Sequence, residues 1–367
     1  MGAISSVTAF LVKAKMVRPF RIAYDYIEEV ETVFVRVETR DGLVGWGEAP
    51  PAPKITGDTV ESIGGAVKAA SKALKGLDPL EYVRVWRELG RVIKGNPAAK
   101  DGITSAVLDL AGKAAGLPTY RLLGGWVREF ETDYTLSLDE PEAMAEEARE
   151  WVSKGFRVLK VKLGGPPERD VERVRAVREA VGESVALRVD ANQAWSLKEA
   201  LLTIKSLEAL GVELVEQPLP AGALDDLRVL RERTLIPIVL DESVHTLTDA
   251  VKAVTAGACD GVNVKLAKAG GILGGLEIAN TVSALGKSLM IGCMSETRLG
   301  IAAAAHLVAA HGGFRYVDLD ADLFLQEDPA SGGFVRDGGI VRLADRPGLG
   351  VDVREDVLKP LKPGTNT

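Results

Sequence analysis

Two lysines in a short apolar segment are the first residues that could do chemistry. Residues 157–163 are mainly β-branched and apolar and are bounded by Gly155 and by a Gly-Gly-Pro-Pro run at 164–167, which predicts a strand. Lys160 and Lys162 are two residues apart, so their side chains lie on the same face of that strand. Two adjacent ammonium groups repel each other and resist burial, which lowers their pKa values and requires anions nearby. An edge strand with both lysines in solvent is the alternative.

Carboxylates end the next three predicted strands, and a further lysine ends the fourth. Asp190, Glu216, Asp241 and Lys265 follow Lys162 at successive steps of 28, 26, 25 and 24 residues. Each step is close to one strand–loop–helix–loop unit, roughly 30 residues in an eight-unit barrel. The carboxyl ends of the strands carry the active site in such barrels. One charged residue at a strand end is commonplace, but five in phase favour a functional site.

The three converging carboxylates predict a bound divalent cation. Asp190, Glu216 and Asp241 would repel one another strongly without a cation between them. Oxygen ligands on rigid strands suit Mg²⁺, which keeps positions open for substrate oxygens. Lys162 and Lys265 belong to strands four apart in an eight-stranded ring, so we expect them to face a bound substrate from opposite sides.

This arrangement suits proton transfer at a single carbon atom. A carboxylate substrate chelated by Mg²⁺ becomes acidic at its α-carbon, because the metal stabilises the enediolate that forms. One of the two lysines, Lys162 or Lys265, would remove the α-proton and the other would protonate the opposite face, giving racemisation or epimerisation. Lys160 would stabilise the substrate carboxylate and depress the pKa of Lys162. Asn192 and Glu242 are expected to support the metal ligands, with ordinary loop capping as the alternative.

The elements that must position these residues form a predicted barrel. Its first strand is expected at residues 132–137, its seventh at 288–293 and its eighth at 315–320. Amphipathic runs between strands, such as 170–181 and 197–210, predict the covering helices. The sequence therefore predicts a parallel β/α array.

The residues before the barrel predict a separate α+β region. Alternating strands followed by helices are typical of such a region. The expected strands cover residues 4–16, 31–39 and 43–48, with a hairpin turn at 40–42, and the expected helices cover 59–74, a segment opening at Asp78-Pro79, and 98–115. Residues 18–30 lack a clean period and are predicted to be a loop, and the Pro-rich residues 49–58 form a second, rigid loop.

The predicted fold class is therefore α/β: a (β/α)7–8 TIM-type barrel with an N-terminal α+β capping domain that the C-terminal tail completes. We place the capping domain with its specificity loops at residues 1–125 and the barrel with the active site at 126–327. The C-terminal segment, 328–367, contains a predicted strand at 339–343 and returns to the capping domain.

Composition limits the classes of partner. The chain has 367 residues, of which 46% are hydrophobic and 26% charged, as is ordinary for a soluble globular enzyme. The net charge of −7 argues against nucleic acid or an anionic membrane as a partner. The sequence shows no signal-peptide pattern and no 18-residue apolar stretch, so we expect a cytoplasmic protein. Cys259 and Cys293 form no CxxC motif, and three histidines are too few for a His-rich metal site.

The chain resembles the muconate-lactonising subgroup of the enolase superfamily over essentially its whole length. The motifs that carry the resemblance are Lys-Val-Lys at 160–162, Asp-Ala-Asn-Gln at 190–193, Glu-Gln-Pro at 216–218, Asp-Glu-Ser at 241–243 and Asn-Val-Lys-Leu-Ala-Lys-Ala-Gly-Gly at 263–271. The resemblance implies that Asp190, Glu216 and Asp241 are Mg²⁺ ligands, that Lys162 and Lys265 are paired acid/base groups, and that the protein forms a closed homo-oligomer. Mandelate-racemase-like members would carry a catalytic His on the seventh strand, where this chain has Cys293-Met294.

Two acids on the eighth strand help to choose among the subgroup's reactions. These reactions are muconate cycloisomerisation, dehydration to o-succinylbenzoate, racemisation of N-acylamino acids and epimerisation of dipeptides. Asp318 and Asp320 share one face of their strand, and two unpaired carboxylates suit a free ammonium group, which N-acylated substrates lack. The Asp-x-Asp pair, with residues 292–297 and 55–58, resembles the dipeptide epimerases, in which it holds the amine of an L,L-dipeptide whose C-terminal residue is inverted. A loop-capping role for either acid is the alternative.

Five further residues complete the expected substrate site: Asp25, Ile55, Thr135, Met294 and Ser295. In epimerases acting on alanyl-glutamate a basic residue matches the position of Asp25, so an acid here should repel Glu and favour a cationic or neutral C-terminal residue. Asp25 pointing into solvent is the alternative. A lyase of the o-succinylbenzoate type is expected only if the Asp pair lies outside the pocket. A non-enzymatic binding barrel is disfavoured, because burying unpaired charges without function is costly.

Overall fold

The capping region is built on one antiparallel sheet. The computed structural model describes residues 2–361. The sheet has the order β17-β1-β2-β3, with β17 at Lys359–Pro360, β1 at Ile4–Ile22, β2 at Asp25–Thr39 and β3 at Val44–Ala49. Helix α3 (Pro97–Ala115) lies directly on β3, because Gly45 and Gly47 place no side chain between strand and helix. The other helical segments of this region are α1 (Val60–Leu74), η1 (Pro79–Glu81), α2 (Tyr82–Val92) and α4 (Thr119–Leu122).

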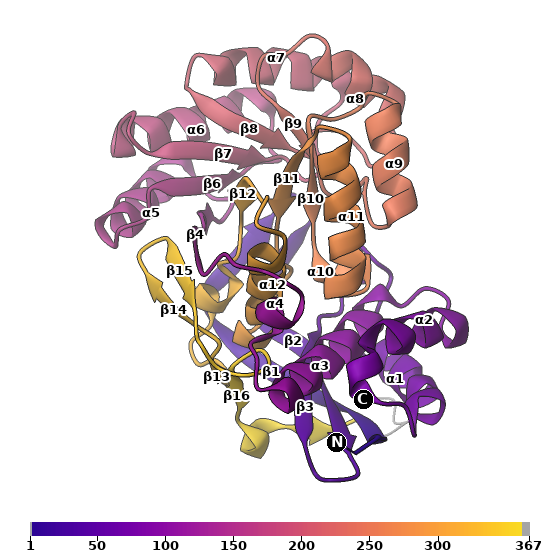
Figure 1. Cartoon of the computed structure of the whole chain (residues 1–367). Helices are drawn as coiled ribbons and strands as arrows, with labels where there is room; N and C mark the ends of the chain where they lie inside the picture. The colour runs from indigo at the N-terminus through magenta and orange to yellow at the C-terminus, as the bar shows by residue number, and fades with distance from the viewer. Residues whose placement is uncertain (1, 362–367) are drawn as a thin grey trace.

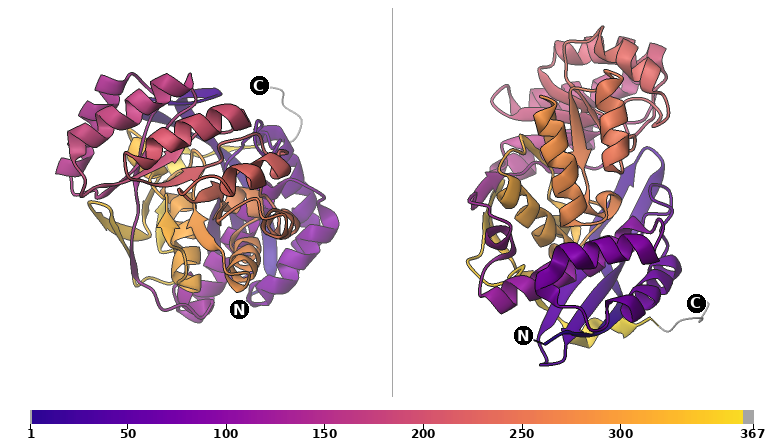
Figure 2. Two further views of the ribbon diagram at one scale, coloured as in Figure 1. Left: turned by 90° about the horizontal axis from the view of Figure 1, so that it is seen from above. Right: turned by 45° about the vertical axis from the view of Figure 1, so that its right-hand side comes forward.

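Strands β1 and β2 continue beyond the capping sheet as a long hairpin, which Figure 2 shows rising beside the barrel. The loop predicted for residues 18–30 is therefore wrong: the strands pair as far as Ile22 and Asp25, with a register shift between Lys15 and Phe20. The tip is tied to the barrel, since Arg21 N donates to Ser137 Oγ (2.8 Å) and Leu138 N donates to Arg21 O (2.9 Å). The hairpin thus covers the carboxyl end of the barrel.

Eight parallel strands form the barrel in the order β5 to β12 (Figure 1). They are β5 (Tyr134–Leu136), β6 (Val158–Lys162), β7 (Ala186–Asp190), β8 (Val212–Glu216), β9 (Ile238–Leu240), β10 (Gly261–Val264), β11 (Ser288–Ile291) and β12 (Tyr316–Val317). The outer helices are α5 (Pro141–Ser153), α6 (Pro167–Val181), α7 (Leu197–Glu208), α8 (Leu224–Arg231), α9 (Leu247–Thr255), α10 (Leu266–Ala269), α11 (Ile272–Ala284) and α12 (Arg298–His311).

The barrel has seven β/α units and an eighth strand. A hydrogen bond from Asp133 N to Val317 O (3.1 Å) links the first and last strands, and the 3₁₀ turn η2 (Ala321–Phe324) follows β12. The strands are apolar on the face toward the helices, as the buried Leu159, Val161 and Leu187 illustrate. The predicted α/β fold class is confirmed.

The C-terminal segment only partly behaves as predicted. The strand expected at 339–343 is β15 (Ile340–Leu343), which pairs with β14 (Phe334–Asp337) and with β4 (Glu129–Glu131) rather than with the capping sheet. The tail then forms β13 (Ala330–Gly332), β16 (Val351–Val353), η3 (Glu355–Val357) and β17 (Lys359–Pro360). β17 pairs with β1, so the tail does complete the capping sheet. Residue 1 and residues 362–367 of the predicted segments lie outside the described residues.

A buried glutamate joins the capping sheet to the barrel. Glu48 of β3 accepts hydrogen bonds from Thr297 N (3.0 Å), Thr297 Oγ1 (2.5 Å) and Gly300 N (2.9 Å) at the start of α12. A carboxylate in this place satisfies N–H groups that have no partner within the helix and complements the helix dipole. Across the described residues, no helix is long and apolar enough to cross a membrane.

Candidate active site

The strand register brings the predicted charged residues together. Lys162 of β6 lies opposite Asp190 of β7, and Asp190 lies opposite Glu216 of β8. Asp241 directly follows β9 and Lys265 directly follows β10. All five residues are at the same end of the barrel and at most 7% exposed. The alternative of a solvent-exposed edge strand is excluded, because β6 lies between β5 and β7.

Lys162 and Lys265 contact different carboxylates. Lys162 Nζ donates to Asp190 Oδ2 (2.6 Å) and to Asn192 Oδ1 (3.2 Å). Lys265 Nζ lies 2.8 Å from Asp241 Oδ2. Burial lowers the pKa of Lys265, but the attraction of Asp241 and Glu216 outweighs it and raises this pKa well above its usual value. The two ammonium groups therefore reach the site from separate strands.

Lys160 lies at the centre of a carboxylate cluster. Its Nζ is 2.7 Å from Asp318 Oδ2, 2.7 Å from Glu216 Oε2 and 3.2 Å from Asp190 Oδ2, and the side chain is 1% exposed. Burial lowers its pKa, yet these carboxylates, with Asp318 the strongest, raise the pKa of Lys160 well above its usual value. The lowered pKa expected for Lys160 is thus wrong here, because the anions outweigh both burial and the neighbouring lysine.

The carboxylate oxygens of the three predicted ligands are of the donor type that suits a hard divalent cation. Burial and then repulsion by Asp190 raise the pKa of Glu216. Glu216 Oε2 is buried without a hydrogen bond, since its 2.7 Å contact with Lys160 is an ion pair that lacks hydrogen-bond geometry. Burial would also raise the pKa values of Asp190 and Asp241, but the adjacent lysines hold both below their usual range. A cation among these oxygens would give Glu216 Oε2 a partner and offset the mutual repulsion.

Three residues around the ligands were not predicted. Lys268 Nζ contacts Asp241 Oδ1 and donates to Asn263 O (3.3 Å), and burial lowers the pKa of Lys268. Asn263 Nδ2 donates to Glu216 Oε1 (2.7 Å), and Gln217 Oε1 accepts from Asp241 N (3.0 Å). Lys268 follows Lys265 by three residues, so one turn of α10 returns it to the strand end; this spacing was a usable signal.

Asn192 and Glu242 belong to the same network. Asn192 has a φ of 43°, which asparagine tolerates, and its N donates to Asp190 Oδ1 (2.9 Å). Its Nδ2 donates to Glu242 Oε1 (3.3 Å). Burial and then Asp241 raise the pKa of Glu242 to about 7. Asn192 therefore contacts a predicted ligand and Lys162 directly, and Glu242 is joined to them through Asn192, so neither residue is only a loop cap.

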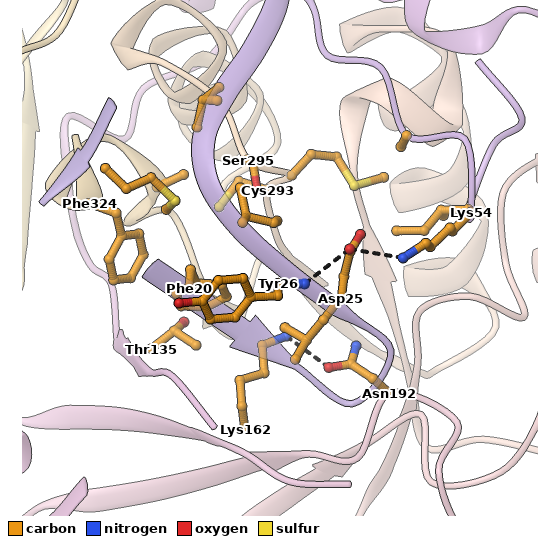
Figure 3. A pocket seen from close by; sticks show the side chains of 18 of the residues that line it. Phe20, Asp25, Tyr26, Lys54, Thr135, Lys162, Asn192, Cys293, Ser295 and Phe324 are labelled. Carbon is orange, nitrogen blue, oxygen red and sulfur yellow. Dashed lines mark hydrogen bonds and ion pairs between the residues drawn. The ribbon is translucent and has the colours of Figure 1, made fainter. Parts of the chain in front are cut away.

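A cavity of about 500 Å³ opens above these residues (Figure 3). Lys160, Lys162 and Lys265 line its floor, and the β1–β2 hairpin and the Pro-rich loop form its roof. The lining includes every predicted substrate residue: Asp25, Ile55, Thr135, Met294, Ser295, Asp318 and Asp320. Apolar groups of the roof, among them Phe20 and Ile22, also line the cavity.

The two acids that follow the eighth strand, β12, differ in protonation. Asp318 accepts from Thr135 Oγ1 (3.2 Å) and from Lys160; burial opposes ionisation, but Lys160 lowers the pKa of Asp318 to about 2. Asp320 accepts from Thr135 N (2.6 Å), and burial followed by repulsion from Asp318 raises its pKa to about 7. Both acids line the cavity, so neither is only a loop cap.

Asp25 lies at the hairpin tip beside a lysine. Its Oδ1 is 2.9 Å from Lys54 Nζ, and the two side chains are 37% and 53% exposed. Such exposed pairs contribute about 0–1 kcal/mol, so the pair opens easily. Further acids of β2, Glu28, Glu29 and Glu31, also line the cavity. This rim of the cavity therefore carries more acidic than basic groups.

Two family profiles match most of the chain. Residues 6–124 match the mandelate racemase / muconate lactonizing enzyme N-terminal domain. Residues 143–357 match the enolase C-terminal domain-like family.

Characterised relatives align over nearly the full length. An L-Ala-D/L-Glu epimerase of Bacillus subtilis is 39% identical over 92% of this chain and 93% of its own. A hydrophobic dipeptide epimerase of Enterococcus faecalis is 40% identical over 92% and 96%. An L-Lys-D/L-Arg epimerase of Methylococcus capsulatus is 39% identical over 92% and 95%.

Solved structures agree in fold. The dipeptide epimerase of Enterococcus faecalis, complexed with Mg and the dipeptide L-Leu-L-Tyr, has a TM-score of 0.93 at 40% identity and covers 96% of this chain and 99% of its own. The dipeptide epimerase of Methylococcus capsulatus, complexed with Mg and L-Arg-D-Lys, has a TM-score of 0.90 at 37% identity, with coverage of 96% and 99%. With both of its halves matched by the family and full-length relatives near 40% identity, the chain belongs to the mandelate racemase/muconate lactonizing enzyme family of the enolase superfamily.

Proposed function

We propose that this protein is a Mg²⁺-dependent dipeptide epimerase that inverts the α-carbon of the C-terminal residue of an L,L-dipeptide. One observation carries the proposal: a single cavity is lined both by Lys162 and Lys265 and by the acids Asp318 and Asp320. The first pair suits proton transfer and the second suits a free amine. Relatives that share the fold act on dipeptides and bind Mg.

Asp190, Glu216 and Asp241 would hold the metal. Bound there, Mg²⁺ supplies stabilisation of the negative charge that develops on the substrate carboxylate. The same carboxylates hold Lys162 and Lys265 in ion pairs, and as ligands of the metal they would release either lysine for proton transfer.

The two lysines divide the proton transfer. One of them, Lys162 or Lys265, takes the α-proton into its free amine, and the other donates a proton from its ammonium group to the opposite face. The reverse reaction exchanges these roles. Lys160 remains protonated between Asp318 and Glu216, so it ties the amine-binding acids to the metal ligands and adds positive charge near the substrate carboxylate.

Asp318 and Asp320 would bind the dipeptide's ammonium group. Asp318 is ionised near neutral pH, and the ammonium group would favour ionisation of Asp320 as well. N-acylated amino acids and the succinylbenzoate precursor offer no such cation. The position of both acids in the cavity therefore counts against the lyase and the N-acyl racemase, and a muconate substrate has no use for them either.

The side chain at the inverted centre should be cationic or neutral. Relatives of nearly equal identity act on Ala-Glu, hydrophobic and Lys-Arg dipeptides, so identity alone does not select a substrate. The acidic rim that includes Asp25, Glu28 and Glu29 disfavours a Glu side chain by charge repulsion. Lys54 reduces this effect at Asp25, which is why neutral side chains stay within the proposal.

A dipeptide panel assayed in D₂O tests the function. We expect deuterium at the α-carbon of the C-terminal residue with inversion, and loss of inversion in both Lys162→Ala and Lys265→Ala. Each variant should still exchange the α-proton of the one diastereomer that its remaining lysine serves. Turnover that needs only one lysine overturns two-base epimerisation, and a strong preference for Ala-Glu over Ala-Lys or Ala-Arg overturns the role given to the acidic rim. The homo-oligomer stays a prediction.

A further inference from the structure

The tip of the β1–β2 hairpin reaches the polar network through one hydroxyl group. Tyr24 lies between the two strands, lines the cavity and is partly buried. Its hydroxyl donates to Glu242 Oε1 (3.3 Å), and its carbonyl accepts from Lys54 Nζ (2.9 Å). Burial, followed by repulsion from Glu242, raises the pKa of Tyr24 well above its usual value. The hydroxyl is therefore a permanent donor.

Among residues 2–361, a series of hydrogen bonds leads from this hydroxyl to one of the two catalytic lysines, Lys162. Glu242 Oε1 accepts from Tyr24 and also from Asn192 Nδ2, each at 3.3 Å. The other end of the same amide, Asn192 Oδ1, accepts from Lys162 Nζ (3.2 Å), as Figure 3 shows. Lys265 instead pairs with Asp241. The hydrogen-bonded path from the hairpin thus ends at Lys162, whereas Lys265 acts on Tyr24 and Glu242 through its charge.

Packing at the hairpin tip supports the same link. Ala23 fits against Gly164, two residues after Lys162, so closely that a β-carbon on Gly164 would collide with it. Gly164 also has a φ of 129°, a conformation that other residues rarely adopt. The hairpin therefore contacts the segment that follows Lys162 through Ala23, while the hydroxyl of Tyr24 reaches Glu242.

We propose that Tyr24 is a positioning residue that sets the orientation of Lys162 through Glu242 and Asn192 when the hairpin covers the cavity. The physical basis is the fixed amide of Asn192: its Nδ2 must face Glu242 for its Oδ1 to face the lysine. The Tyr24 hydroxyl holds Glu242 Oε1 in place for this contact. This inference rests on the proposed two-base epimerisation and adds that only one of the two proton transfers depends on the hairpin.

The test is Tyr24→Phe, with proton exchange measured separately on the two faces of the α-carbon. The α-proton exchange of the L,L- and L,D-dipeptides in D₂O is followed separately, after Lys162→Ala and Lys265→Ala have shown which diastereomer each lysine serves. We expect the Lys162-dependent exchange to fall roughly threefold to tenfold, the effect of one lost hydrogen bond. The rate of the Lys265-dependent exchange should stay within about twofold of its value in the unmodified protein. The series of hydrogen bonds that begins at Tyr24 does not include Lys265.

Two further measurements separate positioning from a general structural effect. In an Asn192→Ala background, Tyr24→Phe should add little further loss on the Lys162 face, since residues acting through one network are non-additive. Tyr82→Phe, in α2 outside the cavity, is the matched control and should leave both rates unchanged. Equal slowing of both faces, or of neither, overturns the inference. Absence of exchange on both faces in the unmodified protein would instead overturn the proposed function.

Discussion

Replacing Asp320 with asparagine isolates the charge of the proposed amine site. Asp320 Oδ2 accepts from Thr135 N (2.6 Å), and an asparagine Oδ1 can accept the same bond. The fold should therefore be kept while the carboxylate charge is lost. Asp318 remains ionised beside Lys160, because its pKa is about 2. The variant thus removes one of two anions that would contact the ammonium group.

The size of the effect follows from burial. Truncating one partner of a buried, hydrogen-bonded charge pair costs about 2–5 kcal/mol. Asp320 is 2% exposed, but Asp318 still binds the ammonium group, so we expect the lower part of this range, about 2–3 kcal/mol. At about 1.36 kcal/mol per tenfold change, kcat/KM for an L,L-dipeptide should fall roughly 30- to 150-fold.

The assay compares a dipeptide with its N-acetyl derivative in both proteins. The Asp320→Asn substitution should lower kcat/KM for the free dipeptide alone, because the N-acetyl compound carries no cation. Burial and Asp318 hold the pKa of Asp320 at about 7, so kcat/KM of the unmodified protein should rise with pH through about 7, and Asp320→Asn should lack this limb.

Stability provides the control for this variant. The pKa of Asp320 is raised in the folded state, so its stabilising contribution is complete below its ordinary value of 3.8 and is lost as the pH rises through about 7. Asp320→Asn should therefore be no less stable than the unmodified protein at pH 8. An equal loss of kcat/KM for the free and N-acetylated compounds, or no loss for either, would refute the reasoning.

Three further substitutions test the site and its support. In Glu216→Gln the thermal stabilisation by Mg²⁺, about 2.7 kcal/mol at 100 times its Kd in the unmodified protein, should disappear from melting curves; a retained shift places the ion elsewhere. Lys268→Met should lower the free energy of unfolding by about 3–5 kcal/mol in denaturant titrations, because Asp241 loses a buried partner; a neutral result would show that Lys265 suffices. Glu48→Gln should cost about 1–3 kcal/mol by the same measurement, because an amide N–H₂ group cannot accept from Thr297 and Gly300; unchanged stability would contradict the capping role.

The barrel was predictable because its signals are local and repeated. Each strand is a short apolar run ending in a charged residue, and the step from Lys162 to Lys265 repeats a nearly constant length four times. Parallel strands put their carboxyl ends on one edge of the sheet, so sequence spacing alone placed Asp190, Glu216 and Asp241 at the same end of the barrel.

The missed features depend on contacts between distant segments. The hairpin of residues 18–30 does alternate at Phe20, Ile22 and Tyr24, which line the cavity, but the charged residues between and after them conceal the pattern. The pKa of Lys160 had the wrong predicted direction because Asp318 reaches it from the eighth strand, 158 residues away. The sequence shows which groups are charged but not how many anions surround each one.

The glutamate that caps α12 has a consequence for protein engineering. The substrate preference of such enzymes could be altered with chimaeras, in which the region that contains the hairpin is exchanged between relatives. Here the donor of that region must also bring an acid at position 48, since Thr297 N and Gly300 N at the start of α12 take their hydrogen-bond acceptor from β3. A chimaera without this acid would leave buried N–H groups unpaired a few residues from Met294 and Ser295, which line the cavity. A change intended to alter specificity would therefore first destabilise the cavity wall.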